Sequence, residues 1–287
     1  MAPEAATKAI LYAALLPTVG AGAAFLLLVP RAAMETGAAQ SATPKSLALV
    51  EQRLRRVGAI AALCVVVALA LRAWAQTDAA FGLASSFSPD SLQTILTSRW
   101  GLRWHWQLLA AVACTIAYAC AGGGRRWAWA AAATTSVALC VSLTLTGHAS
   151  GDPARMAVHA AHLVGGGLWI GALTSLVLVS PSIDARTRVA LFHAFSPFAL
   201  AGACIAAGAG AAAALFYVGA VENLWLTAYG RALAVKVAFV AGVAVCGYLN
   251  WRRAREGAAP GRPVAVELTL AAAVVIVTGI LTELAHP

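Results

Sequence analysis

Long apolar runs recur along the chain from near its first residue to its last. A bilayer core about 30 Å thick needs about 20 consecutive, mostly apolar residues in each helix. The runs consist of Ala, Leu, Val and Gly without strict alternation of polar and apolar positions, which favours membrane-spanning helices over an outer-membrane barrel. The pattern predicts an all-α, polytopic membrane protein with eight transmembrane helices over residues 8–29, 56–75, 104–121, 127–148, 154–179, 192–218, 231–251 and 264–285.

The connections between these predicted helices are short. The two longest, about residues 30–55 and 76–103, are too short to form independent domains, so residues 1–287 are predicted to form a single membrane domain. The first run has one lysine at its start, Lys8, and its strongest positive charge after it, which is the reverse of a secretory signal. We therefore expect it to be a retained helix, surrounded like the others by membrane lipid.

Composition and charge support this class of protein. Hydrophobic residues make up 61% of the chain and charged residues 11%, against about 45–50% and about 25% in an ordinary soluble domain. That difference excludes a disordered protein, a nucleic-acid binder and a typical cytosolic enzyme. The chain also lacks the G-x-x-x-x-G-K-[ST] loop of nucleotide-binding proteins, so neither nucleic acid nor nucleotide is an expected partner.

The net charge of +9 follows from membrane topology. Cytoplasmic loops carry an excess of Lys and Arg. Most of the 20 basic residues fall in the first, third, fifth and seventh connections, which predicts that these connections are cytoplasmic and that both termini lie outside, in the periplasm. The residues are Arg31, Lys45, Arg53, Arg55, Arg56, Arg125, Arg126, Arg186, Arg188, Arg252, Arg253, Arg255 and Arg262.

The same topology places five of the six histidines in the outer half of the membrane domain. Neutral imidazole is a common metal ligand, so this distribution predicts a metal site near the periplasm. The five are His105, His148, His159, His162 and His286, whereas His193 falls on the cytoplasmic side.

The densest group surrounds the hairpin before the helix over 154–179. Asp152 followed by Pro153 is typical of an N-cap and a first helical position. A helix that starts there carries His159 and His162 on one face, about 9–14 Å below its beginning, with His148 at the mouth. Because ionisable residues inside a membrane are costly and functional by default, we interpret the three histidines as metal ligands.

Other polar residues are further candidates. Glu283 and His286 repeat the i,i+3 spacing at the outer end of the last helix and offer a carboxylate and an imidazole, although both are also compatible with a solvated helix end. His105 opens the helix over 104–121, where a single histidine is often only a helix–helix hydrogen bond. Lys236 and Glu267 lie on helices that can meet, which suggests an internal ion pair or a snorkelling lysine.

The glycines at 165–167 predict close approach of a neighbouring helix, as small residues do in membranes. The six cysteines all lie within apolar runs and form no C-x-x-C motif, so we interpret them as small buried hydrophobic residues.

With these residues placed, the chain resembles the bacterial copper resistance protein D family (CopD/PcoD). The resemblance is strongest over residues 95–287, where the family landmarks occur in order, whereas the first two helices match only in hydropathy. The landmarks are Thr146-Gly147-His148-Ala149, His162-Leu163 through Trp169-Ile170-Gly171, Phe195-Ser196, Tyr229-Gly230-Arg231-Ala232-Leu233 with Lys236, Asn250-Trp251-Arg252-Arg253, and Glu267.

The resemblance implies an eight-helix protein of the bacterial inner membrane that passes copper from the periplasm toward the cytoplasm, in partnership with a periplasmic copper carrier of the CopC type. His148 and His162 match the family's histidines. His159 stands where family members often carry Asp, and His105 lies outside the family pattern. Imidazole suits Cu(II), and three imidazoles also hold Cu(I), so the oxidation state stays open.

The sequence therefore predicts a copper importer and not an enzyme. Two alternatives stay open at this point. The first is a copper sensor or cuproenzyme assembly factor that translocates nothing, since no continuous series of ligands reaches the cytoplasmic half. The second is a b-type haem redox protein with His148 and His162 as axial ligands.

Overall fold

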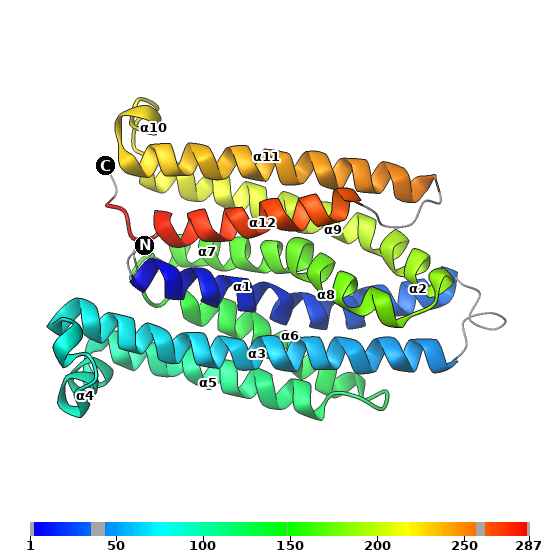
Figure 1. The fold of residues 1–287 in the computed structure, drawn as a ribbon, viewed down its shortest axis with the longest axis horizontal. Helices are drawn as coiled ribbons and strands as arrows, with labels where there is room; N and C mark the ends of the chain where they lie inside the picture. The colour runs from blue at the N-terminus through cyan, green and yellow to red at the C-terminus, as the bar shows by residue number, and fades with distance from the viewer. Residues whose placement is uncertain (1–2, 36–43, 148, 257–261, 286–287) are drawn as a thin grey trace.

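The computed structural model describes residues 3–35, 44–147, 149–256 and 262–285, which form helices, turns and no strand. The prediction of an all-helical protein is confirmed. The helices, shown in Figure 1, are α1 (Pro3–Ala23), η1 (Ala24–Leu28), α2 (Val29–Glu35), α3 (Pro44–Phe81), η2 (Leu83–Ser85), α4 (Pro89–Thr97), α5 (Arg99–Cys120), α6 (Arg126–Leu143), α7 (Pro153–Gly166), η3 (Gly167–Gly171), α8 (Ala172–Val179), η4 (Ser180–Ser182), α9 (Ala185–Tyr217), α10 (Asn223–Leu226), α11 (Ala228–Arg255) and α12 (Arg262–Leu281).

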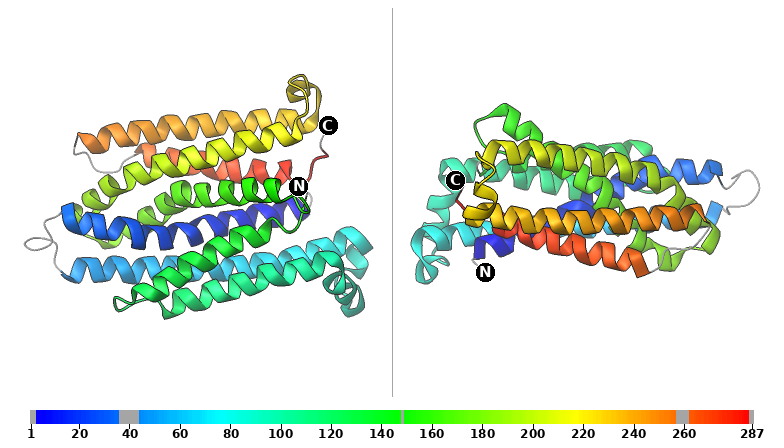
Figure 2. Two further views of the ribbon diagram at one scale, coloured as in Figure 1. Left: turned by 180° about the vertical axis from the view of Figure 1, so that it is seen from behind. Right: turned by 90° about the horizontal axis from the view of Figure 1, so that it is seen from above.

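The long helices lie side by side in one bundle (Figures 1 and 2). Within the described part of the chain, six helices are long and apolar enough to cross a membrane: Pro3–Met34, Ser46–Phe81, Pro153–Ser182, Ala185–Tyr217, Ala228–Arg253 and Pro263–Leu281. Large apolar side chains such as Leu200 and Leu215 are exposed on the outside of the bundle, as lipid contact requires. The chain is thus a multi-pass membrane protein.

The two remaining predicted spans, 104–121 and 127–148, coincide with α5 and α6, which pack against each other and, through α5, against α3. These two helices are not among the six that meet the length and hydropathy requirement. The predicted total of eight spans therefore stays a prediction.

Several helices extend beyond the apolar runs. The predicted helix over 56–75 is the central part of the 38-residue α3. The predicted connection over 76–103 contains the end of α3, the short helices η2 and α4, and the start of α5. Hydropathy identifies the part of a helix that lies in the bilayer core, whereas backbone hydrogen bonding continues into polar sequence.

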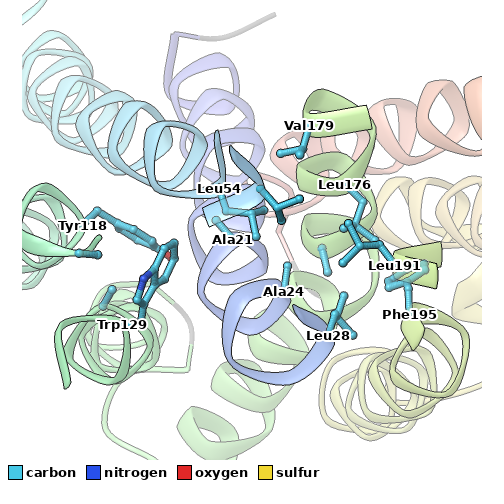
Figure 3. Packing of buried hydrophobic residues seen from close by; sticks show 14 of the residues in the cluster. Ala21, Ala24, Leu28, Leu54, Tyr118, Trp129, Leu176, Val179, Leu191 and Phe195 are labelled. Carbon is cyan, nitrogen blue, oxygen red and sulfur yellow. The ribbon is translucent and has the colours of Figure 1, made fainter. Parts of the chain in front are cut away.

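Helix α1 lies in the centre of the bundle, with α3, α6, α8 and α12 against it. Figure 3 shows Tyr118 and Trp129 on one side of it and Leu176 and Leu191 on the other. The Trp129 ring stacks on Phe25 with centroids 4.0 Å apart, and the Tyr118 hydroxyl donates to the Thr18 carbonyl. Aromatic packing and one buried hydrogen bond therefore join α5 and α6 to α1 and η1.

Glycines bring three helices into backbone contact. A Cβ atom added at Gly20 of α1 would lie 2.0 Å from the carbonyl carbon of Gly171, at the end of the π-helix η3. A Cβ at Gly165 would lie 2.6 Å from the backbone nitrogen of Ala206 in α9. The close approach predicted at the 165–167 glycines is confirmed, because a Cβ atom added at Gly167 would also lie 2.5 Å from Val19 Cβ.

The first turn of α1 and the last turn of α12 lie at the same end of the bundle (Figure 1). We call it the terminal end. It also carries α4, the hairpin between α6 and α7, and the turn between α9 and α10. The connections between α5 and α6 and between α8 and α9 lie at the opposite end (Figure 1).

Candidate functional site

A cavity of about 170 Å³ opens at the terminal end, between α1, α3, α6, α7, α9, α11 and α12. Many of the residues that line it are polar or ionisable. It contains two histidines (His159 and His162), three basic residues (Lys8, Arg72 and Lys236), three tyrosines (Tyr12, Tyr217 and Tyr229) and four threonines (Thr144, Thr146, Thr278 and Thr282). Such residues inside a membrane domain indicate a functional site.

The start of α7 places the two histidines. The Asp152 carboxylate accepts hydrogen bonds from the backbone nitrogens of Ala154 and Arg155 at 2.9 and 3.3 Å, and Pro153 is the first helical residue. The predicted N-cap is therefore confirmed. His162 follows His159 by three positions, so both project from one face of α7, and both line the cavity.

His162 is fixed by α9. Its Nδ1 lies 2.7 Å from the carbonyl oxygen of Ala206. Since a carbonyl only accepts, Nδ1 carries the hydrogen and the lone pair resides on Nε2, the nitrogen that can bind a metal. A backbone carbonyl that orients the imidazole in this way is a common partner of metal-binding histidines. The backbone contact at Gly165 and Gly202 brings Ala206 this close.

His159 contacts a different residue of the same helix. Its Nε2 lies 3.2 Å from the Tyr217 hydroxyl, and the two ring centroids are 5.7 Å apart. The half-buried His159 is therefore linked to α9 through a side chain rather than through the backbone. Sequence spacing predicted the histidine pair, but it gave no sign of Tyr217, which lies 58 residues away along the chain.

The other predicted ligands are placed differently. His148 and His286 lie outside the described residues. Glu283 forms an ion pair with Lys8 of α1. His105 is exposed on α5, where its Nδ1 lies 2.7 Å from the Gly101 carbonyl and its ring meets Trp104 edge-on. Among the described residues, no three His, Cys, Asp or Glu side chains lie close enough together to hold a metal ion, so the structure brings together His159 and His162 alone of the predicted ligands.

Lys236 was not predicted to belong to this site. It lines the cavity and lies within electrostatic range of His162. The suggested ion pair with Glu267 is wrong, because Glu267 accepts a hydrogen bond from the Asn250 side-chain nitrogen at 2.6 Å. Lys236 and Asn250 both lie on α11 but are about 21 Å apart along it.

A second polar cluster surrounds Glu267, which is only 2% exposed. Besides Asn250, it interacts with the side chain of Trp169 in η3, and a Cβ atom added at Gly247 would lie 3.3 Å from its Oε1. Three residues that are far apart in the sequence, Trp169, Asn250 and Glu267, therefore meet where η3, α11 and α12 converge. Buried polar groups of this kind need such partners to be tolerated.

Two protein families match parts of the chain. The family described as copper resistance protein D-like, N-terminal domain, matches residues 3–155, and copper resistance protein D matches residues 189–282. The first match includes α1 and α3, for which sequence inspection offered hydropathy alone. His159 and His162 lie in the segment between the two matches, and other cavity residues come from both matched segments.

The chain is also 27% identical over 259 residues to the copper transport protein CutJ of Bacillus subtilis (strain 168). That alignment covers 85% of this chain and 48% of CutJ, so the chain spans about half the length of this relative. No solved structure matches the chain.

Proposed function

Because the chain belongs to the copper resistance protein D family, we propose that it binds copper in the cavity at the terminal end and carries it across the bacterial inner membrane, from the periplasm toward the cytoplasm. In this role the protein is a carrier and not an enzyme. A periplasmic carrier of the CopC type is the proposed donor. Copper is the cargo.

The observation that supports this function best is the pair of histidines in the cavity. The Ala206 carbonyl holds the hydrogen on Nδ1 of His162 and leaves Nε2 for a metal. His159 adds a second imidazole from the same helix face. Nitrogen ligands suit Cu(II), and the addition of His148 from the neighbouring hairpin would give a set of three that also holds Cu(I).

The distribution of basic residues supports the orientation. Arg125 precedes α6 and Arg126 is its first residue, and Arg186 and Arg188 lie in the first turn of α9, all at the end of the bundle opposite the cavity. By the positive-inside rule, that end faces the cytoplasm. The terminal end and its cavity then face the periplasm, from which copper enters.

Copper content of the purified protein tests the site. We expect replacement of His148 and His162 by Ala to abolish stoichiometric copper binding, measured by elemental analysis. His159→Ala should weaken this binding. His105→Ala and His193→Ala are matched controls, because both side chains are exposed and neither lines the cavity. Unchanged copper content in the His162 variant would remove this cavity from the proposal.

Uptake into proteoliposomes separates transport from binding alone. Time-dependent accumulation of copper inside the vesicles, lost in the His162→Ala variant, is the expected result. Saturable binding without uptake would instead identify a sensor or an assembly factor. An absorption spectrum of the same preparation tests the haem alternative, because a Soret band would overturn the copper assignment.

A further inference from the structure

The cavity that we propose for copper carries positive charge of its own. Three basic residues line it: Lys8, Arg72 and Lys236. None of the described residues that line it is an aspartate or a glutamate. A copper cation that enters this space meets like charge, and the repulsion is strong where the surroundings hold little water.

Two of the three basic residues have nearby carboxylates. Lys8 forms an ion pair with Glu283 and also lies 3.4 Å from the Thr282 carbonyl. Arg72 lies within electrostatic range of Glu283 and Glu4. Two carboxylates thus balance these two cations, and neither is among the residues that line the cavity.

Lys236 has no such carboxylate partner among the described residues. It lies about 12 Å along α11 from the first residue of that helix, which places it deeper than the ends of the bundle. Among the residues that the structure describes, its ammonium group forms no ion pair and no hydrogen bond, and it lies within electrostatic range of His162. An ammonium group in a membrane domain is costly unless an opposite charge or several polar groups surround it.

We propose that the cavity binds copper together with a small carboxylate anion, and that Lys236 holds this anion. The proposal rests on the proposed function. One carboxylate oxygen accepts from the Lys236 ammonium, and the other coordinates copper that is bound to the imidazole of His162. A carboxylate has enough lone pairs to serve both partners at once.

The cavity suits this pair of occupants. A volume of about 170 Å³ is ample for a metal ion and an anion as small as acetate. The four threonine hydroxyls of the lining already donate to backbone carbonyls, so the anion depends on the Lys236 ammonium as its donor. The anion also neutralises part of the charge of the cargo, which lowers the cost of moving copper through a low-dielectric region.

Copper affinity in two buffers tests the proposal. The intact protein is titrated in acetate and in methanesulfonate at equal ionic strength, with a competing chelator that sets the same free copper concentration in both. We expect acetate to lower the dissociation constant of the wild type about tenfold, the scale of one charge-assisted hydrogen bond. Lys236→Met is expected to lose this dependence. Lys8→Met removes a cation from the same cavity but leaves Lys236, and is expected to keep it.

A second measurement works without copper. ¹³C-labelled acetate should show line broadening with the copper-free wild type and none with Lys236→Met. If the wild type binds copper equally in both buffers, or if Lys236→Met keeps the acetate effect, the anion proposal is overturned. If the wild type binds no copper in either buffer, the proposed function fails, and the acetate spectrum alone then decides for or against the anion site.

Discussion

A single methyl group added to α9 tests whether copper binding depends on the position of the His162 ring. Gly210 faces this ring: a Cβ atom added there would lie 3.2 Å from Cε1 and 3.3 Å from Nδ1. Gly208, two residues earlier on the same helix, has no atom within 4 Å of an added Cβ. Gly210→Ala and Gly208→Ala are therefore the same chemical change on one helix, and only the first touches the site.

The expected magnitude follows from these distances. Carbon atoms in favourable contact lie about 3.5–4.0 Å apart, so the ring must move by about 0.3–0.8 Å. Binding sites tolerate displacements up to about 0.5 Å before function suffers. We expect Gly210→Ala to weaken copper binding by about three- to tenfold, or about 0.6–1.4 kcal/mol. Because alanine favours helix over glycine by up to about 1 kcal/mol, Gly208→Ala should leave affinity unchanged and stabilise the fold slightly.

Equilibrium dialysis against a copper chelator measures the two affinities, and thermal unfolding in detergent measures the two stabilities. A Gly210→Ala variant that unfolds like the wild type but binds copper less tightly is the expected result. Equal copper affinity in the two alanine variants would refute the reasoning, since it would mean that copper binding does not depend on the position of the His162 ring.

Two further predictions concern other parts of the structure. The backbone nitrogen and hydroxyl of Thr187 donate to the Asp184 carboxylate at 2.9 and 2.7 Å and lower the pKa of Asp184 to about 2. This N-cap should therefore contribute about 1 kcal/mol to the free energy of unfolding above about pH 4, and this contribution should be lost as the pH falls toward 2. In thermal unfolding, the Asp184→Asn variant should still cap α9 but without that pH dependence. Parallel pH profiles of the wild type and the variant would contradict this. Asn250→Leu should lower the free energy of unfolding by about 1–3 kcal/mol because it removes a donor from buried Glu267. The double variant with Glu267→Gln should lose less than the sum of the single variants, and simple additivity in denaturant unfolding would show that the contact contributes nothing.

Local sequence rules predicted the features that depend on neighbouring residues. Asp152 and Pro153 were sufficient to place the start of α7, and the i,i+3 spacing was sufficient to put His159 and His162 on one face. Hydropathy identified the membrane class, but not the lengths of the helices. The extension of α3 to 38 residues follows from backbone hydrogen bonds that continue where the apolar run stops.

Contacts between distant helices were the part that sequence could not supply. The partners of the two histidines, Ala206 and Tyr217, are 44 and 58 residues away, and neither has a motif that marks it as part of a site. Lys236 illustrates the same limit: the sequence suggested Glu267 as its counter-charge, because both are ionisable residues in apolar helices. Only the register of α11 against α12 decides that Asn250, rather than Lys236, reaches Glu267.

Glycine contacts define the register of α7 and η3 against their own neighbours, α9 and α1. Gly165 and Gly202 leave no room for a side chain between α7 and α9, so the two backbones fix each other's position along the bundle. Gly20 and Gly171 do the same between α1 and η3, about two and a half helical turns beyond His162. The helix that carries His162 is thus held on both sides by backbone rather than by flexible side chains. A ligand mounted on such a helix keeps its geometry when the cavity is empty, and copper binding then costs little reorganisation.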